Sequence, residues 1–314
     1  MVVGARRGVL PTADTRRRPG YAGAMAGVEE FEQHRRYLGA VAYRLLGSVA
    51  DAEDAVQEAW LRWSEVDGAA VENPRAYLTT VVTRLCYDQL GSARARREAY
   101  YGEWLPEPLI DDQLTPHDQA ERGEEVSLAM MAVLERLSPA ERAAFVLHDV
   151  FGVEFPQIAL TLERTEAAVR QLASRARKQV KDSSPRPAVD RGAHRDAVRA
   201  FADAIGKGDI IGLMKVLDPD VVWHSDGGGI VRAGIRPILG ADRVSRMVMG
   251  LLERYWVPGT VMDLVDVNGD PGLALFLPDG AALGVVGFTV VDGLITETYI
   301  VVNPEKLTHV TRAA

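Results

Sequence analysis

The hydrophobic periodicity of this 314-residue chain changes once, close to residue 190, and that change constrains the fold more than any single motif. Before it, apolar residues recur at the three- and four-residue spacing of amphipathic helices. After it, helical stretches at 194–205 and 210–217 are followed by strand-like segments at 221–224, 260–267, 273–277, 283–291 and 294–302. The sequence therefore predicts an all-helical part followed by an α+β part.

Turn and cap residues divide the chain further. Helix starts are indicated at Asp51, at Pro74 and at Ser138-Pro139-Ala140-Glu141, where a capping box coincides with a proline at the first helical position. Asp279-Gly280 and Asp292-Gly293 are typical of hairpin turns whose two central residues need positive φ. The predicted divisions are a disordered extension at 1–24, helical units at 25–98 and 126–182, linkers at 99–125 and 183–192, and the α+β domain at 193–314. The extension would also be explained if translation started at Met25 and the codon for Met1 were an upstream start codon.

Composition limits the function classes. A single cysteine, Cys86, excludes an internal disulfide and a zinc site built from paired cysteines, so we expect the cytoplasm, with no metal and no cofactor. The longest nearly uncharged apolar run, 281–291, is too short to span a membrane. The net charge of −8 suggests no nucleic-acid partner, but the charge is uneven: residues 164–181 hold six basic groups and one acid, whereas residues 98–125 hold nine acids and one arginine.

The basic stretch lies in the most informative segment, residues 145–181. A helix, a glycine-bearing connection, a short helix, a tight turn and a longer basic helix together indicate a helix-turn-helix. In the last helix the apolar positions would face the core, and the polar side chains would face outward, where they suit phosphates and base edges: Arg170, Gln171, Ser174, Arg175, Lys178 and Lys181. The alternative is an ordinary solvated charged face.

Three stretches resemble the extracytoplasmic-function sigma factors, the smallest kind of bacterial RNA polymerase specificity subunit. They are AYRLLGSVADAEDAVQEAWLRW (42–63), NPRAYLTTVVTRLCYDQLGSARARR (73–97) and LSPAERAAFVLHDVFGVEFPQIALTLERTEAAVRQLASRARKQV (137–180). They correspond to sigma regions two and four, which are the only regions these factors retain. The resemblance implies a non-catalytic subunit that binds core RNA polymerase, through the beta-prime clamp helices and the beta flap, together with promoter DNA.

The resemblance also implies roles for individual residues. Region four would contact the minus 35 element through Arg164, Thr165, Arg170, Gln171, Ser174, Arg175 and Lys178. Region two would read and open the minus 10 element through Asn73, Arg75, Tyr77, Arg84, Arg94, Arg96 and Arg97, although Tyr77 also has the spacing of a core residue. Core polymerase would be bound by Asp51, Glu53, Asp54, Gln57 and Glu58, some of which also favour a helix N-terminus electrostatically.

The linker and tail resemble the SigJ-like subgroup, in which a SnoaL-like domain with the cone-shaped fold of nuclear transport factor two is fused to the C-terminus. The matching motifs are YYGEWLPEP (100–108), DGGG (226–229) and NPEKL (303–307); Ile230 stands where the subgroup usually has a basic residue. The resemblance implies that the tail replaces a separate anti-sigma protein. The residues expected to carry this regulation are Trp104, Pro106, Asp226, Gly227, Asn303 and Lys306.

A second hypothesis concerns the pocket of the cone. Some proteins with this fold are isomerases or cyclases that use a pocket acid or base, and His224, Asp226, Tyr255 and Tyr299 are the candidates here. A histidine on a strand and an aspartate before a glycine turn are also ordinary structural choices, so no catalytic residue is predicted. The alternative function is a ligand-sensing or catalytic SnoaL-like domain that controls a DNA-binding module through a small-molecule ligand in its pocket.

Overall fold

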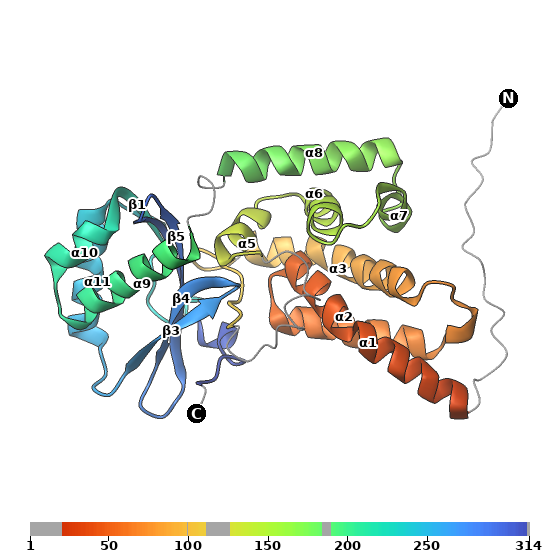
Figure 1. Ribbon diagram of the computed structural model, residues 1–314, viewed down its shortest axis with the longest axis horizontal. Helices are drawn as coiled ribbons and strands as arrows, with labels where there is room; N and C mark the ends of the chain where they lie inside the picture. The colour runs from red at the N-terminus through yellow and green to blue at the C-terminus, as the bar shows by residue number, and fades with distance from the viewer. Residues whose placement is uncertain (1–20, 99, 111–125, 184–189, 313–314) are drawn as a thin grey trace.

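The computed structural model describes residues 21–98, 100–110, 126–183 and 190–312, and the side chains within these ranges other than those of 21–26, 69, 92–98 and 183. Figure 1 shows a helical part and an α+β part that lie side by side, with α8 along one edge of the helical part. No helix in these ranges is long and apolar enough to cross a membrane.

Three long helices form the first unit. They are α1 (Tyr21–Leu46), α2 (Val49–Ser64) and α3 (Pro74–Glu98), with a 3-10 turn, η1 (Gly68–Ala70), before α3. The Ser48 side chain caps α2 by accepting a hydrogen bond from the Asp51 amide, so the predicted helix start is confirmed within three residues. Because α1 begins at Tyr21, the predicted disordered extension is wrong for residues 21–24; residues 1–20 lie outside the described ranges.

The second unit contains the predicted helix-turn-helix. Its elements are α5 (Leu128–Leu134), α6 (Pro139–Phe145), a π-helical turn η2 (Val146–Val150), α7 (Phe155–Thr161) and α8 (Glu166–Ser183). The capping box is present, with Ser138 and Glu141 bonding each other's backbone N–H groups. Glu163 adopts a φ of 53° in the turn between α7 and α8, which lets the chain change direction within four residues.

The two helical units share one hydrophobic core. Residues of α1, α2 and α3 and residues of α5 to α8 belong to a single buried cluster, and α7 packs directly on α3. Arg142 of α6 is 1% exposed and donates from Nε to the carbonyl of Arg44 at the end of α1 (3.0 Å). The helix-turn-helix is therefore folded back on the first unit rather than extended away from it.

The α+β part is built on one six-stranded sheet in the order β2-β1-β6-β5-β4-β3. The strands are β1 (Leu217–Asp226), β2 (Ile238–Leu239), β3 (Val261–Val267), β4 (Asp270–Phe276), β5 (Ala282–Val291) and β6 (Leu294–Val301); only the β1–β6 pair is parallel. Helices α9 (Arg191–Gly206), α10 (Ile210–Val216) and α11 (Ala241–Tyr255) cover one face, and a 3-10 turn, η3 (Pro304–Lys306), follows β6. This is the predicted cone-shaped α+β fold of the SnoaL-like domains.

Turn chemistry agrees with the sequence at one predicted hairpin and differs at the other. Asp292 and Gly293 both have positive φ, as the two-residue turn requires. At the other hairpin only Gly280 has positive φ, and Leu277 and Ala281 close a longer loop. All five predicted strands are confirmed, whereas β2 and α11 were not predicted.

Both faces of the sheet are covered. The inner face packs against α9, α10 and α11 and is filled by a core that includes Phe201, Trp223 and Phe288. The outer face packs against the linker and α5 through a second cluster that includes Leu105 and Leu128. The sheet therefore lies between its own helices and the helical part of the chain, which brings the tail into contact with the linker.

Candidate nucleic-acid interface and linker clamp

The outward face of α8 is the predicted DNA-reading surface. Val169, Leu172, Ala173, Ala176 and Val180 are buried. The residues predicted for the minus 35 element are all exposed: Arg164, Thr165, Arg170, Gln171, Ser174, Arg175 and Lys178. The Thr165 hydroxyl also accepts a hydrogen bond from the Ala168 amide (3.2 Å), which fixes the start of the helix. The helix thus presents a continuous polar and basic face to solvent.

Two arginines of this face already have protein partners. Arg170 forms an ion pair with Glu166 (2.5 Å) and lies over the ring of Phe155, and Arg175 donates to Glu141 of α6 (2.8 Å). Burial raises the pKa of Glu141, but hydrogen bonds from Ser138 and from Arg175 outweigh it and leave that pKa below its usual value. Exposed pairs of this kind contribute about 1 kcal/mol or less. A phosphate can therefore displace the carboxylate from either arginine.

The residues predicted to bind core polymerase share one face of α2. Glu53, Asp54 and Gln57 are exposed, and Asp51 and Glu58 are partly buried. Leu61, one helical turn after Gln57, belongs to the same face and is 53% exposed. Sequence reasoning missed Leu61, although a leucine at an outward position of an acidic helix was the signal that could have found it.

The residues predicted for the minus 10 element lie along α3 in different environments. Asn73 caps α3 by accepting from the Ala76 amide (3.0 Å), Arg75 lies over the ring of Tyr37, and Tyr77 is half-buried beside Trp63. Arg94, Arg96 and Arg97 belong to the last turns of α3, and their side chains lie outside the described ones. The predicted set is therefore not one uniformly exposed surface.

Arg84 is held by the helix-turn-helix. Its guanidinium donates to the carbonyls of Thr161 (3.2 Å) and Leu160 (3.1 Å) at the end of α7. The end of a helix attracts cations because its last carbonyls are unpaired. Thr80 of α3 also meets Thr161, with 3.4 Å between their hydroxyl oxygens. A predicted minus 10 residue is therefore bonded to the element that precedes the predicted minus 35 helix.

The predicted regulatory residues converge on one buried carboxylate. Asp226 is fully buried and accepts four hydrogen bonds, from the hydroxyl of Tyr100 (2.7 Å), the amides of Leu105 (2.8 Å) and Gly228 (3.1 Å), and Nζ of Lys306 (2.7 Å). Burial, followed by the hydrogen bond to Asp226, raises the pKa of Tyr100 far above its usual value. We call Tyr100, Leu105, Asp226 and Lys306 the linker clamp, because two of them lie in the linker and two in the SnoaL-like domain.

Neighbouring residues complete the linker clamp. Lys306 also donates to the Leu105 carbonyl (2.5 Å) and lies 3.8 Å from the centre of the Trp104 ring. Asn303 donates to the Tyr100 hydroxyl (2.8 Å). Pro106 is buried, and a Cβ added to Gly227 would lie 2.2 Å from the Val231 carbonyl oxygen, so the loop at 227 requires glycine. The structure thus brings together all six residues predicted to carry regulation.

The candidate acids and bases of the cone do not share its interior. His224 pairs with Tyr299 in the parallel register of β1 and β6, their rings stack 4.8 Å apart, and His224 Nδ1 bonds the linker residue Glu103 (2.6 Å). Tyr299 belongs to the outer-face cluster, and Tyr255 is 49% exposed at the end of α11. These candidates therefore do not meet in one pocket: the alternation of β1 and β6 turns His224 and Tyr299 toward the linker, and Tyr255 lies at the end of a helix.

A third contact joins region two to both the linker and the tail. The Tyr43 hydroxyl donates to the Glu107 carbonyl (2.6 Å) and accepts from Asn268 Nδ2 (2.8 Å). The Glu107 carboxylate accepts from the Val49 amide at the start of α2 (2.7 Å). Sequence reasoning missed this junction, although Asn268-Gly269, both at positive φ, is a recognisable hairpin turn. Among the described residues no cluster of three His, Cys, Asp or Glu side chains could hold a metal.

Comparison with known proteins agrees with this geometry. Residues 30–96 match the family model Sigma-70 region 2, and residues 127–180 match Sigma-70, region 4. The ECF RNA polymerase sigma factor SigJ of Mycobacterium tuberculosis is 44% identical over 295 residues, which are 90% of this chain and 93% of that protein. The probable ECF RNA polymerase sigma factor SigI of the same species is 36% identical over 277 residues, or 87% and 92% of the two chains.

The solved structure of the Mycobacterium tuberculosis sigma factor SigJ is similar over the same extent. It matches with a TM-score of 0.72 and 40% identity, and the match covers 90% of this chain and 98% of that one. Sequence and fold thus agree across both sigma regions and the C-terminal domain. The chain belongs to the extracytoplasmic-function sigma factors, the non-catalytic subunits that bind RNA polymerase and direct transcription initiation at promoters.

Proposed function

We propose that this sigma factor binds core polymerase in the cytoplasm through the acidic face of α2, which would dock on the beta-prime clamp helices, while region four contacts the beta flap. The support for the first contact is the composition of the face. Glu53, Asp54 and Gln57 surround the exposed Leu61, and an exposed apolar side chain within a charged surface is typical of an interaction site. This face is accessible while the helix-turn-helix is folded back.

Promoter recognition is assigned to two helices. The exposed face of α8 would enter the major groove at the minus 35 element, because Arg, Gln and Ser side chains there can meet phosphates and base edges. The face of α3 that carries Arg75 and Arg84 would bind the minus 10 element, where cations hold the phosphates of the opened strand. Both assignments extend the family role to individual residues of this chain.

The folded-back arrangement would have to open before both elements are bound. The elements are named for positions about 25 base pairs apart, which is about 85 Å of B-DNA at about 3.4 Å per base pair. In the structure Arg84 bonds the Thr161 carbonyl, and Thr161 is only four residues, at most about 14 Å of chain, from Thr165. One promoter cannot meet both surfaces in this state, so we infer that it is a closed, inactive state.

The SnoaL-like domain would stabilise this closed state by holding the linker. The observation that carries this proposal is the linker clamp, in which the buried ion pair of Asp226 and Lys306 binds backbone and side-chain groups of the linker. Trp104, held by Lys306, lies against region two: a Cβ added to Gly47 would be 3.0 Å from its ring and 2.7 Å from Glu135 of region four. Trp104, which Lys306 holds beside the clamp, thus lies next to region two at a point that Glu135 of region four also approaches.

The experiment is run-off transcription with core polymerase and a cognate promoter. Lys306→Met keeps the aliphatic stem but removes the charge that holds Asp226 and the Leu105 carbonyl. We expect this variant to initiate several-fold more transcripts than the wild type at equal binding to core polymerase, because the closed state is weakened. Lys215→Met, an exposed lysine of α10, is the matched control.

Two outcomes would count against the clamp's proposed role. Equal initiation by Lys306→Met and Lys215→Met would show that the clamp does not restrain the sigma regions. Reduced initiation at unchanged core binding would show that the tail activates instead. Neither outcome would affect the assignment to the sigma factors, because the core-binding measurement is separate.

Catalysis by the tail has no support in the geometry. Two of the candidate acid and base residues are bonded to the linker instead. His224 bonds Glu103, and Asp226 accepts hydrogen bonds from Tyr100 and Leu105. We therefore propose that these side chains hold the linker and do not act on a substrate. The ligand-sensing alternative has one specific observation in its favour, a cavity on the outer face of the sheet.

A further inference from the structure

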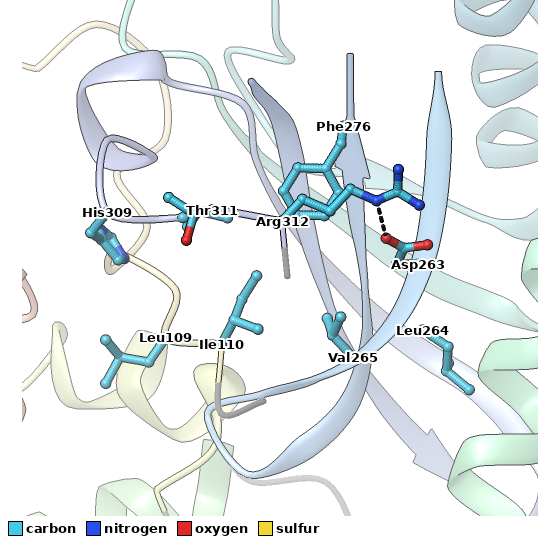
Figure 2. A pocket seen from close by; sticks show the side chains of 10 residues that line it. Leu109, Ile110, Asp263, Leu264, Val265, Phe276, His309, Thr311 and Arg312 are labelled. Carbon is cyan, nitrogen blue, oxygen red and sulfur yellow. Dashed lines mark hydrogen bonds and ion pairs between the residues drawn. The ribbon is translucent and has the colours of Figure 1, made fainter. Parts of the chain in front are cut away.

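A cavity of about 360 Å³ lies where the linker, the outer face of the sheet and the C-terminal segment meet. Figure 2 shows that Ile110 enters from the linker, Val265 and Phe276 from β3 and β4, and His309 and Arg312 from the C-terminal segment. Its volume is at the lower end of the about 300–1,000 Å³ that small-molecule sites have. The cavity lies on the opposite face of the sheet from the helices of the cone, so it is distinct from the pocket expected for this fold.

The lining has an apolar wall and a charged rim. Ile110, Val265 and Phe276 form part of the wall, and Val265 and Phe276 belong to the outer-face core. At the rim Arg312 donates from Nε to Asp263 Oδ2 (2.8 Å), as Figure 2 shows. The Nη groups of Arg312 have no hydrogen-bond partner among the residues that the structure describes, and its side chain is 44% exposed. An arginine can bind a carboxylate through two parallel N–H groups.

These features select the chemistry of an occupant. An aliphatic or aromatic body would lie against the apolar wall, and a single anionic head would reach Arg312. A cationic head would find Asp263 already neutralised by that arginine. The cavity is too small for a macromolecule, so a small organic acid fits best.

Two linker residues, Leu109 and Ile110, form part of the cavity wall and are bonded to the sheet. Ile110 forms a β-bridge with Val267, and Leu109 exchanges hydrogen bonds with Asn268: the Leu109 amide donates to Asn268 Oδ1 (3.0 Å), and the Asn268 amide donates to the Leu109 carbonyl (2.8 Å). Asn268 in turn donates to Tyr43 of region two. The cavity therefore has its full wall only while the linker is docked on both the tail and region two.

We propose that this cavity is an effector site for a small amphipathic carboxylate, and that its occupation stabilises the docked linker and so represses initiation. A ligand that binds one conformation shifts the equilibrium toward it. The repression rests on the closed state of the proposed function, whereas the binding does not. The site is tested with decanoate as the acidic probe and decanol as its uncharged counterpart.

Binding is measured by calorimetry on the full chain without polymerase. Arg312→Gln and Asp263→Asn break the same ion pair, so a merely structural effect would change decanoate affinity in the same direction in both. We expect Arg312→Gln to weaken decanoate binding about tenfold, because a charge-assisted contact is lost. Asp263→Asn should strengthen it, because the competing carboxylate is gone. Decanol should bind alike to both variants.

A second pair of variants tests the location. Thr311 is exposed and lines the cavity, whereas Thr308 is exposed in the same segment but does not line it. Thr311→Trp should abolish decanoate binding by filling the space, and Thr308→Trp should bind as the wild type does. Binding by Thr311→Trp at wild-type strength, or equal shifts in the two ion-pair variants, would overturn the site.

Coupling to the linker is read by hydrogen exchange. Decanoate should slow exchange of the Leu105 and Leu109 amides, which donate to Asp226 and Asn268 in the docked state. It should also lower run-off transcription by the wild type but not by Thr311→Trp. Binding without slower exchange would overturn the repression and leave the site in place. Slower exchange without repression would instead contradict the proposed closed state.

Discussion

Asp226 shows how one buried side chain can join segments that are far apart in the sequence. Its carboxylate binds linker groups of Tyr100 and Leu105, more than 120 residues away, and it is neutralised by Lys306. Removing one partner of a buried ion pair costs about 3–5 kcal/mol because the other charge is left without compensation. The pair therefore ties the docking of the linker to the integrity of the tail, and Lys306→Met tests this at the level of initiation.

His194 gives a prediction about pH at the same scale. Burial, followed by the charge of Arg191, lowers the pKa of this histidine below its usual value of 6.5, so the folded chain binds a proton there less readily than the unfolded chain does. Below about pH 6.5 the unfolded chain binds a proton that the folded chain does not, and stability falls as the pH drops toward the folded pKa. His194→Gln should remove part of this loss, measured as the change in thermal midpoint between about pH 7.5 and about pH 5.5. An equal change in the wild type and the variant would contradict it.

At the scale of elements, α8 is both a packed helix and an exposed reading surface. Its buried face follows the spacing predicted from the sequence, and its exposed face carries the predicted DNA contacts. What the sequence could not show is that Glu141, the residue that completes the capping box of α6, also binds Arg175. Cap residues are chosen by local backbone needs, and their contacts with another helix depend on tertiary packing.

The pair of Arg175 and Glu141 can be tested on promoter binding. Arg175→Gln should weaken binding of the holoenzyme to a promoter by about 1–3 kcal/mol, the scale of one specific base contact. Glu141→Gln should strengthen it, because glutamine can keep the capping box while the carboxylate that competes for Arg175 is gone. The measurement is the dissociation constant for promoters with an intact or a scrambled minus 35 element. If Arg175→Gln weakened binding equally to the intact and the scrambled promoter, Arg175 would not contact the bases of the minus 35 element.

The sequence located the strands but did not indicate which face of the sheet each side chain occupies. The alternating segments located β1, β3, β4, β5 and β6 because their apolar runs are long. Since both faces of the sheet are covered, apolar residues occur in both sets of alternate positions, as Val285 and Val286 of β5 show, and alternation alone cannot say which set faces the helices. His224 and Tyr299, the strand residues among the candidates for the pocket of the cone, face the linker instead. The two-residue strand β2 is too short to leave a pattern.

In the whole molecule, the tail and the linker pack against each other and against both sigma regions. The contact of Asn268 with Tyr43 spans 225 residues of sequence, and no local pattern predicts such a pairing. The motifs at 100–108, 226–229 and 303–307 can be recognised in the sequence. For this reason the six regulatory residues could be predicted, and the structure places them close together. Glu103, Glu107 and Tyr43, which make neighbouring contacts with His224, Val49 and Asn268, were not predicted, because each resembles an ordinary surface or core residue in its own segment.

The closed arrangement can be fixed chemically at the contact between α3 and α7. The hydroxyl oxygens of Thr80 and Thr161 are 3.4 Å apart, so cysteines at both positions need only a small shift to reach the about 2 Å of a disulfide. The native Cys86 is buried, and burial raises its thiol pKa far above the usual range, so it should not compete. We expect the oxidised Thr80→Cys/Thr161→Cys variant to bind core polymerase through α2 but to yield no run-off transcript.

Reduction should restore initiation by the double variant, since the only change is the release of α3 from α7. Thr80→Cys alone, treated with the same oxidant, should stay active and so excludes damage to other residues. Full activity of the cross-linked protein would contradict the closed state, because Arg84 would then serve the promoter while still beside Thr161. Loss of core binding on oxidation would instead show that the acidic face of α2 cannot dock while the helix-turn-helix is folded back.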